Sequence, residues 1–588
     1  MNPVISIFGI KSSPLKACFA ALFLFCSIQF SKSQANLATD LDTLKAGYKG
    51  TGELRNVDLL PSFAMGSFGY AGSNQFLFSP FQLLSQGGNL YRSREINSMR
   101  YTSLPHISFA YAFGSSGFQF TKVQYSQAFN KGLVLNLDFL NNQSSGILRN
   151  CGYQDRDILA RIQKKSKSIH SLLSGRFITR NLSWNGGIVA DSLPLTYSLG
   201  LIPVNKADAL SSNKEVQLNW VNHFIVRKDS LWNMGVYLSN SFYSKNRVYT
   251  ETGDLSSLYS AIYYDSSETR DHVQMSTVEN QVGAFYSRGT FKINAGVNQR
   301  FWNYRNNQIY RDTLELGLVE TMHYKSKNLQ FQQAFEYYFL GRSNAWKNSI
   351  RGSVDSKKWK FQGDWSIENS LPELFQRHYS ANNVYYQLSN YLLQFKNNMS
   401  IEANYSFGRH EFQISGAHIL LKNPYFFDGQ QWRNNLFTSI QLLKFDVSMD
   451  FNWKGFSFRP LYSLTFQPAS LNFYPTHLAK ARIGLKGGIF KNKKLISFIG
   501  IEPQWVGAYG RMSFLPLLDV FLFNQLTEKQ QGFVDLSFYT GFEVKGFRFF
   551  ARAENIGYFW NNRMIQTVKG YPIPPLQIRL GITWDFWN

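Results

Sequence analysis

The chain has 588 residues and a formal net charge of +23; aromatic residues make up 16% of it and charged residues 17%. A disordered chain is excluded, because disorder goes with high charge and few aromatic residues. After residue 34 no run of about 18 apolar residues occurs, which excludes membrane-spanning helices. This composition favours half-buried strands and the aromatic belts of membrane barrels.

Residues 1–33 have the order of a secretory signal peptide. Basic residues come first, an apolar run over residues 17–25 follows, and small residues complete a cleavage site (Lys11, Lys16, Ser31 and Ser33). We expect cleavage before Gln34, and therefore export. The run is too short for a transmembrane helix, which needs about 20 apolar residues. Lipid attachment at Cys26 is disfavoured, because bulky Phe25 precedes it.

Cleavage would remove Cys18 and Cys26 and leave Cys151 as the only thiol of the mature chain. An intramolecular disulfide could then not form. A large exported protein without disulfides needs another source of stability, and a closed hydrogen-bonded barrel provides one. Cys151 lies among polar residues typical of a loop, which predicts a passive free thiol rather than a reactive one.

Residues 34–97 are the least strand-like part of the mature chain. Glycine and serine gather around Met65-Gly-Ser-Phe-Gly69, and clear strand patterning begins only after this segment. Three interpretations stay open: a periplasmic tail, a partial plug in a barrel lumen, or the first hairpin of the barrel.

Residues 98–588 have the pattern of strands about ten residues long. Apolar and polar residues alternate over 445–453, and Lys454-Gly455 then provides a turn, since glycine allows the positive φ of a tight hairpin. The same design returns at Lys545-Gly546, and connections are alternately short and long. We predict an all-β fold, a transmembrane antiparallel β-barrel of about 18 strands within a range of roughly 16–22.

Residues 578–588 form the most informative strand. Five apolar residues share one face and alternate with Arg579, Gly581, Thr583 and Asp585, which suits a wall with lipid outside and water inside. The segment resembles the C-terminal signal of bacterial outer-membrane barrels, carried here by Arg579, Gly581, Trp584 and Phe586. Trp587 and Asn588 extend beyond the usual terminal aromatic residue. The resemblance implies an outer-membrane location and insertion by the barrel assembly machinery.

Three further segments resemble the putative porin family of Bacteroidetes-type bacteria. Leu515-Pro-Leu-Leu-Asp519-Val-Phe521 is similar to that family's segment before the final hairpins, and Phe549-Phe-Ala-Arg-Ala-Glu-Asn555 to its penultimate strand. Gly570-Tyr-Pro-Ile-Pro574 leads into the last strand in the same way. The likeness is weaker at Met65–Gly69, where Ser67 replaces the Asn that the family tends to have. The resemblance implies a passive or semi-selective channel without catalytic residues.

The inward positions of the best-phased strands and their turns carry six basic and six acidic residues, so this part of the lumen is balanced. The lumen candidates are Arg548, Arg552, Glu554 and Arg579. They could face a solute path, or form mutual salt bridges that brace the wall.

The basic excess, which is still +20 after the loss of three signal-peptide lysines, gathers in residues 161–167, 357–360 and 491–494. These clusters are predicted to be connections at a rim. There they would pair with phosphates of outer-leaflet lipopolysaccharide or of the periplasmic-side lipids, or would simply be solvated. A weak preference for anions follows as a hypothesis.

Enzyme function is not expected. The nine His residues form no HExxH motif, no Gly-x-Ser-x-Gly elbow occurs, and a single mature Cys argues against a Cys-rich metal site. The adjacent pairs Asp271-His272 and His410-Glu411 would point to opposite faces of a strand and could not form a dyad. We therefore expect no cofactor and no metal. Export also makes nucleic acid an improbable partner.

The sequence predicts an outer-membrane porin-like channel for passive diffusion of small hydrophilic solutes. One alternative is a non-conducting barrel that binds a partner protein or secretion machinery. A TonB-dependent transporter is a weaker alternative, since only about 65 residues separate the signal peptide from the strands, too few for the plug of well over a hundred residues that such proteins share. Whether the barrel forms a homo-oligomer stays open.

Phe586→Ala tests the assembly signal. We expect lower levels of the barrel in the outer membrane with export unchanged, because the terminal aromatic residue would be missing from the recognised strand. Immunoblots of outer-membrane and periplasmic fractions measure this. Normal accumulation of the variant would show that the signal assignment is wrong.

Overall fold

The computed structural model describes residues 99–587, apart from 130–131, 230, 342–344, 435–437, 469–470, 491–493, 523–527 and 561–564. The predicted signal peptide and the segment 34–97 lie outside the described residues. Within the described ranges, no helix is long and apolar enough to cross a membrane.

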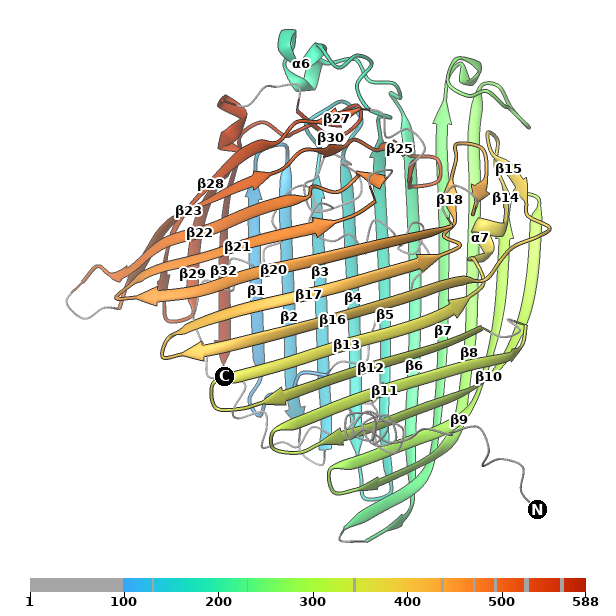
Figure 1. The fold of residues 1–588 in the computed structure, drawn as a ribbon, viewed down its shortest axis with the longest axis vertical. Helices are drawn as coiled ribbons and strands as arrows, with labels where there is room; N and C mark the ends of the chain where they lie inside the picture. Colours follow the sequence, from blue (N-terminus) through green and yellow to red (C-terminus); the bar gives the residue numbers. More distant parts are fainter. Residues whose placement is uncertain are drawn as a thin grey trace, which may run out of the picture.

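Twenty-two antiparallel strands form one sheet that closes into a barrel (Figure 1). In ring order the first eleven are β1 (His106–Gly114), β2 (Phe118–Phe129), β3 (Leu133–Ser144), β4 (Tyr153–Lys165), β5 (Ile169–Trp184), β6 (Ala209–Lys228), β7 (Trp232–Thr252), β8 (Glu268–Arg288), β9 (Phe291–Asn306), β10 (Ile309–Lys325) and β11 (Leu329–Leu340). The others are β12 (Ala345–Asp355), β13 (Trp359–Ser370), β16 (Gln394–Phe407), β17 (His410–Lys422), β20 (Ser439–Trp453), β21 (Phe456–Phe466), β22 (His477–Gly488), β23 (Ile496–Val506), β28 (Phe533–Val544), β29 (Phe547–Glu554) and β32 (Gln577–Trp587).

The sheet closes where the first strand meets the last. β1 pairs with β2 on one side and with β32 on the other, in a register that joins His106 to Trp587 and Gly114 to Arg579. Closure gives the backbone of every wall strand a partner on both sides, which a hydrocarbon environment requires. The closed ring therefore leaves β1 without a free edge for a further strand.

The wall has 22 strands and not the predicted number of about 18, and so lies at the upper limit of the predicted range of 16–22. β12 illustrates the reason. On its outward face, Asn348 and Gly352 alternate with the apolar residues Ile350 and Val354. The strand therefore lacks the continuous apolar stripe by which a strand is recognised in a sequence. In a wide barrel the inward face is polar as well, and such a strand carries little periodic signal.

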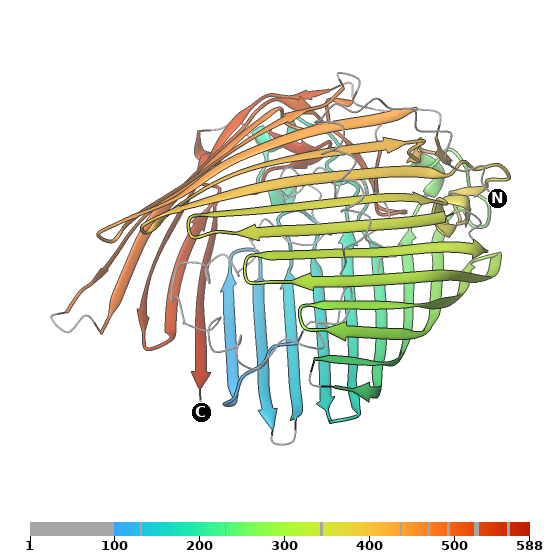
Figure 2. The ribbon, with the colours of Figure 1, turned by 60° about the horizontal axis from the view of Figure 1, so that its bottom comes forward.

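Connections differ in length at the two ends of the barrel (Figures 1 and 2). Short turns join strands at the end where β1 begins and β32 stops, and we call this end the short-turn rim. The opposite end, the long-loop rim, carries the long connections. They contain α6 (Leu193–Thr196), η3 (Leu199–Leu201), η4 (Leu255–Ser257), α7 (Leu374–Arg377), β14 (His378–Ser380), β15 (Tyr385–Gln387), β18 (Phe426–Phe427), β19 (Trp432–Arg433), β24 (Tyr509–Gly510), β25 (Ser513–Leu515), β26 (Val520–Leu522), β27 (Lys529–Gln530), η6 (Ile556–Phe559), β30 (Gln566–Val568) and β31 (Tyr571–Pro572).

The two faces of the wall have opposite chemistry. Large apolar side chains such as Leu173, Ile401 and Ile578 are about half exposed on the outside, as expected for a surface that lipid covers. Charged and amide side chains line the inside, where Asn136 and Arg579 are buried. The main apolar core lies between the long connections and the inner wall of the long-loop rim.

Candidate channel lumen and mouth

The four predicted lumen residues lie on the inner faces of β29 and β32 and are all in ion pairs; Arg552, Glu554 and Arg579 share one network, and Arg548 belongs to another. Arg552 and Glu554 are 2.7 Å apart, Arg579 lies 3.5 Å from Glu554, and Arg548 lies 3.0 Å from Glu543 on β28. Arg579 is only 1% exposed. At least in this part of the wall the arrangement braces neighbouring strands, because each charge has an opposite charge as its neighbour.

Sequence reasoning missed two members of the Arg552 network. Arg482 on β22 and Glu502 on β23 pair with each other, and Glu502 also pairs with Arg552. The signal was present, since Ile499 and Ile501 alternate with Gly500 and Glu502.

The four residues of the predicted assembly signal divide between the two faces of β32. Trp584 and Phe586 face outward with ring centroids 4.0 Å apart. Gly581 faces inward, where a Cβ would lie 2.7 Å from the Tyr111 carbonyl oxygen and would overlap the Phe550 ring. Glycine is therefore required sterically at the seam between first and last strands.

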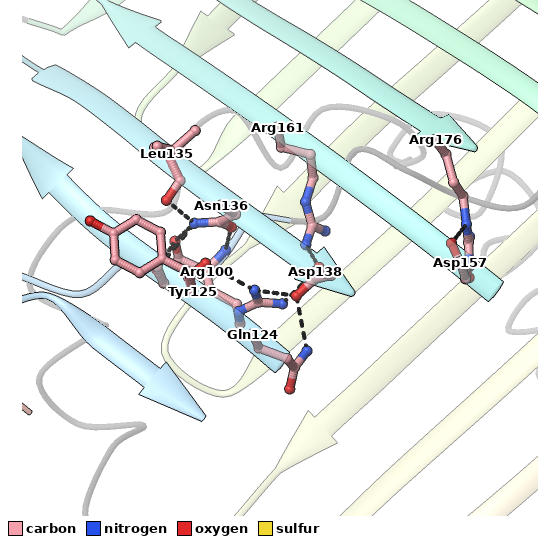
Figure 3. A network of polar contacts seen from close by, with 10 residues as sticks. Arg100, Gln124, Tyr125, Leu135, Asn136, Asp138, Asp157, Arg161 and Arg176 are labelled. Atoms are coloured by element: carbon pink, nitrogen blue, oxygen red, sulfur yellow. Dashed lines mark hydrogen bonds and ion pairs between the residues drawn. The ribbon is translucent and has the colours of Figure 1, made fainter. Parts of the chain in front are cut away.

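The chain enters β1 from inside the barrel (Figure 3). The Arg100 backbone N–H donates to Asn136 Oδ1 at 2.7 Å, and its guanidinium lies 2.5 Å from Asp138; both partners are on the inner face of β3. Arg161 of β4 also pairs with Asp138, and Gln124 donates to it at 3.1 Å. Arg161 was predicted to belong to a basic connection, but it is a buried inner-wall residue of a strand.

Long connections fold inward and pack together across the mouth at the long-loop rim. We call this layer the apolar cap, and its buried members include Leu199, Ile202, Phe375, Tyr379, Phe427, Phe473, Leu517 and Leu518. It packs against Trp184 of β5 and Leu442 of β20, which are the fifth and sixteenth of the 22 strands in the ring and so lie on opposite sides. The cap therefore spans the mouth.

One hairpin of the cap, β25–β26, is tied to the inner wall. Arg247 on β7 donates from Nη2 to the Pro516 carbonyl oxygen at 3.0 Å. Asp519, at the tip of this hairpin, has a φ of +60° and lies among Arg247, Lys245 and Arg180. Burial raises the pKa of the Asp519 carboxyl above its ordinary value, and the three cations oppose that rise.

Another sector of the inner wall faces water. Arg351 on β12 pairs with Asp364 on β13, and the two side chains are 58% and 32% exposed. Lys396 on β16 lies 3.8 Å from Glu368 on β13, and both are about a third exposed. Charged side chains that keep their hydration in this way can line an aqueous path.

Among the described residues no group of three His, Cys, Asp or Glu side chains could hold a metal ion. Asp271-His272 and His410-Glu411 lie in β8 and β17, so the members of each pair point to opposite faces.

A family model described as putative porin matches residues 28–588. The chain belongs to the putative porin family. Family and fold together imply that this protein is a β-barrel of the outer membrane.

Solved outer-membrane structures resemble the barrel at low identity. The copper transporter OprC has a TM-score of 0.58 at 11% identity, over 84% of this chain and 82% of its own. The siderophore receptor PirA from Acinetobacter baumannii has a TM-score of 0.58 at 9% identity, over 83% of this chain and 81% of its own. The FrpB iron transporter from Neisseria meningitidis has a TM-score of 0.56 at 10% identity, over 85% of this chain and 83% of its own. At such identities the likeness shows the fold alone. No curated protein matches the sequence significantly.

The buried Cys151 gives a prediction about thiol reactivity. Its Sγ donates to the Leu148 carbonyl oxygen at 3.0 Å, and burial raises the pKa of the thiol to about 11. Because the thiolate is the reactive form, we expect no reaction with a disulfide reagent near neutral pH while the barrel is folded. Ellman's assay before and after denaturation measures this, and rapid labelling of the folded barrel would contradict a passive thiol.

Proposed function

We propose that this protein is an outer-membrane channel for passive diffusion of small hydrophilic solutes. The observation that carries the proposal is the water-exposed, charged inner wall of β12, β13 and β16, represented by Arg351 and Asp364. A barrel sealed by protein would bury these side chains and would have to compensate their desolvation. Charged walls favour hydrated solutes and disfavour apolar ones.

The apolar cap limits the size of what can pass. It spans the mouth from β5 to β20, so a solute would have to pass between the packed connections to reach the water-exposed sector of the wall. We therefore propose small solutes rather than polymers.

A weak anion preference is part of the proposal, because basic side chains predominate in the described short turns. A ring of one sign at a pore entrance raises the local concentration of counter-ions.

A ligand-import receptor is the second candidate. Two observations favour it: the wall has 22 strands, and similar structures are described as a copper transporter, an iron transporter and a siderophore receptor. Outer-membrane transporters of this strand number have a plugged lumen. A barrel that binds a partner protein without conducting is the third candidate, and the apolar cap favours it.

Ion conductance separates the three candidates. We expect the purified mature chain to give small ohmic current steps in a planar bilayer. In asymmetric salt, the reversal potential should have the sign that indicates a preference for anions. Current only after deletion of residues 34–97 would favour the import receptor. Absence of current both from the mature chain and from that deletion variant would favour the partner-binding barrel, and cation preference would contradict the selectivity.

Asp519→Asn probes the hairpin that narrows the mouth. It removes a negative charge that faces Arg180, Lys245 and Arg247, while the bond from Arg247 to Pro516 can persist. We expect the anion-to-cation permeability ratio to rise roughly twofold. Asp265→Asn, at an exposed acid of another long connection, is the matched control and should leave the ratio unchanged. An unchanged or lowered permeability ratio in the Asp519 variant would show that the hairpin does not lie along the solute path.

A further inference from the structure

Charge is distributed unequally between the two rims. In the described residues of the short turns, eight lysine and arginine side chains stand against one acid, Asp229. In the described residues of the long connections, seven basic side chains stand against eight acidic ones. The basic excess of this chain therefore lies on one rim, although long connections contain far more residues.

Basic residues at the two rims also differ in their partners. Arg511 of a long connection lies within ion-pair distance of Asp191 and Glu528, and Lys206 pairs with Glu251 at the end of β7. All eight basic side chains of the short turns are exposed, and none of the ion pairs found among the described residues involves them. Among the described residues, ion pairs therefore account for four of the seven basic residues of the long connections, the others of these four being Arg433 and Lys569, but for none of the eight in the short turns.

Three of the basic turns directly adjoin exposed aromatic residues of the lipid-facing surface. Trp453 is 61% exposed on the outer face of β20, and the next residue is Lys454, whose Nζ lies 5.4 Å from the centre of the indole. Lys358 likewise precedes outward-facing Trp359, and Arg409 follows outward-facing Phe407 by two residues. Since a strand rises about 3.3 Å per residue, these charges lie just beyond the last aromatic residue that lipid can cover.

This position is the depth of lipid headgroups. Aromatic residues in transmembrane barrels mark the two interfaces, and long basic side chains beside them reach toward the polar layer. The short turns of such barrels face the periplasm. The expected alternative of outer-leaflet lipopolysaccharide does not suit these turns, because they lie at the other end of the wall.

We propose that the short-turn rim binds the phosphates of anionic phospholipid headgroups in the periplasmic-side leaflet. The cations are spread around the ring, from Lys167 between β4 and β5 to Lys545 between β28 and β29, as a bilayer that surrounds the barrel requires. A single soluble partner would instead need a cluster on one side. The proposal is independent of whether the lumen conducts.

Lipid selectivity measures this directly. The barrel is reconstituted in phosphatidylcholine vesicles with spin-labelled phosphatidylglycerol or phosphatidylcholine as the tracer, and the motionally restricted fraction of each gives their relative affinity. We expect phosphatidylglycerol to be favoured at least about twofold, with the preference decreasing as salt screens the charges. Inorganic phosphate at the ionic strength of a chloride control should compete no better than chloride, which separates a lipid surface from a free-phosphate site.

A variant with Lys167, Lys327, Lys357, Lys358, Arg409 and Lys454 changed to glutamine should lose most of this preference. The matched control, Arg149→Gln with Lys529→Gln, neutralises exposed cations of the long-loop rim and should retain it. If the six-site variant does not fold, as judged by heat-modifiable migration on gels, Lys357→Gln with Lys358→Gln should give a partial loss. Equal affinity of the native barrel for both lipids, or full selectivity in a folded variant, would overturn the proposal.

Discussion

Closure of the sheet is the constraint on which the rest of this molecule depends. In hydrocarbon an unpaired backbone N–H or C=O costs several kcal/mol, so an open edge between β1 and β32 could not persist. Their register fixes which side chains of the last strand face lipid and which face the lumen. Ile578 and Phe586 are outside as a result, and Arg579 is inside.

A ring of 22 strands encloses more space than its own side chains can fill, and this barrel deals with that space in two ways. Around β22, β23, β29 and β32, inward charges pair across strands, as Arg552 does with Glu502 and Arg579 does with Glu554. Removing one partner of such a buried pair costs about 3–5 kcal/mol, because the other charge stays buried without compensation. At the long-loop rim the connections fill the mouth with an apolar layer. Between these regions the side chains of Arg351 and Asp364 pair with each other and remain exposed to water.

Local alternation was enough to predict the fold class and the inward direction of Arg548, Arg552, Glu554 and Arg579. It could not give the strand number, because strands such as β12 have polar residues on both faces. It also could not predict the apolar cap, whose members are far apart in sequence and meet only when the ring closes. Residues 515–521 are an example. They could be recognised as a family segment, but their contact with Arg247 joins residues far apart in the sequence and could not be predicted from local pattern. Residues 34–97, with their three interpretations, lie outside the described part of the chain.

The excess positive charge of the described residues outside the strands is concentrated at the short-turn rim and not in the long connections. Long connections fold back on themselves, so several of their charges meet partners, as Arg511 meets Glu528. A two-residue turn cannot do this: Lys454 and Lys545 occupy positions with φ near +45° beside a glycine, and their side chains leave the wall. The surroundings of a lysine at that depth are lipid headgroups and water. The length of a connection thus decides whether its charge serves the protein's own packing or its contact with the bilayer.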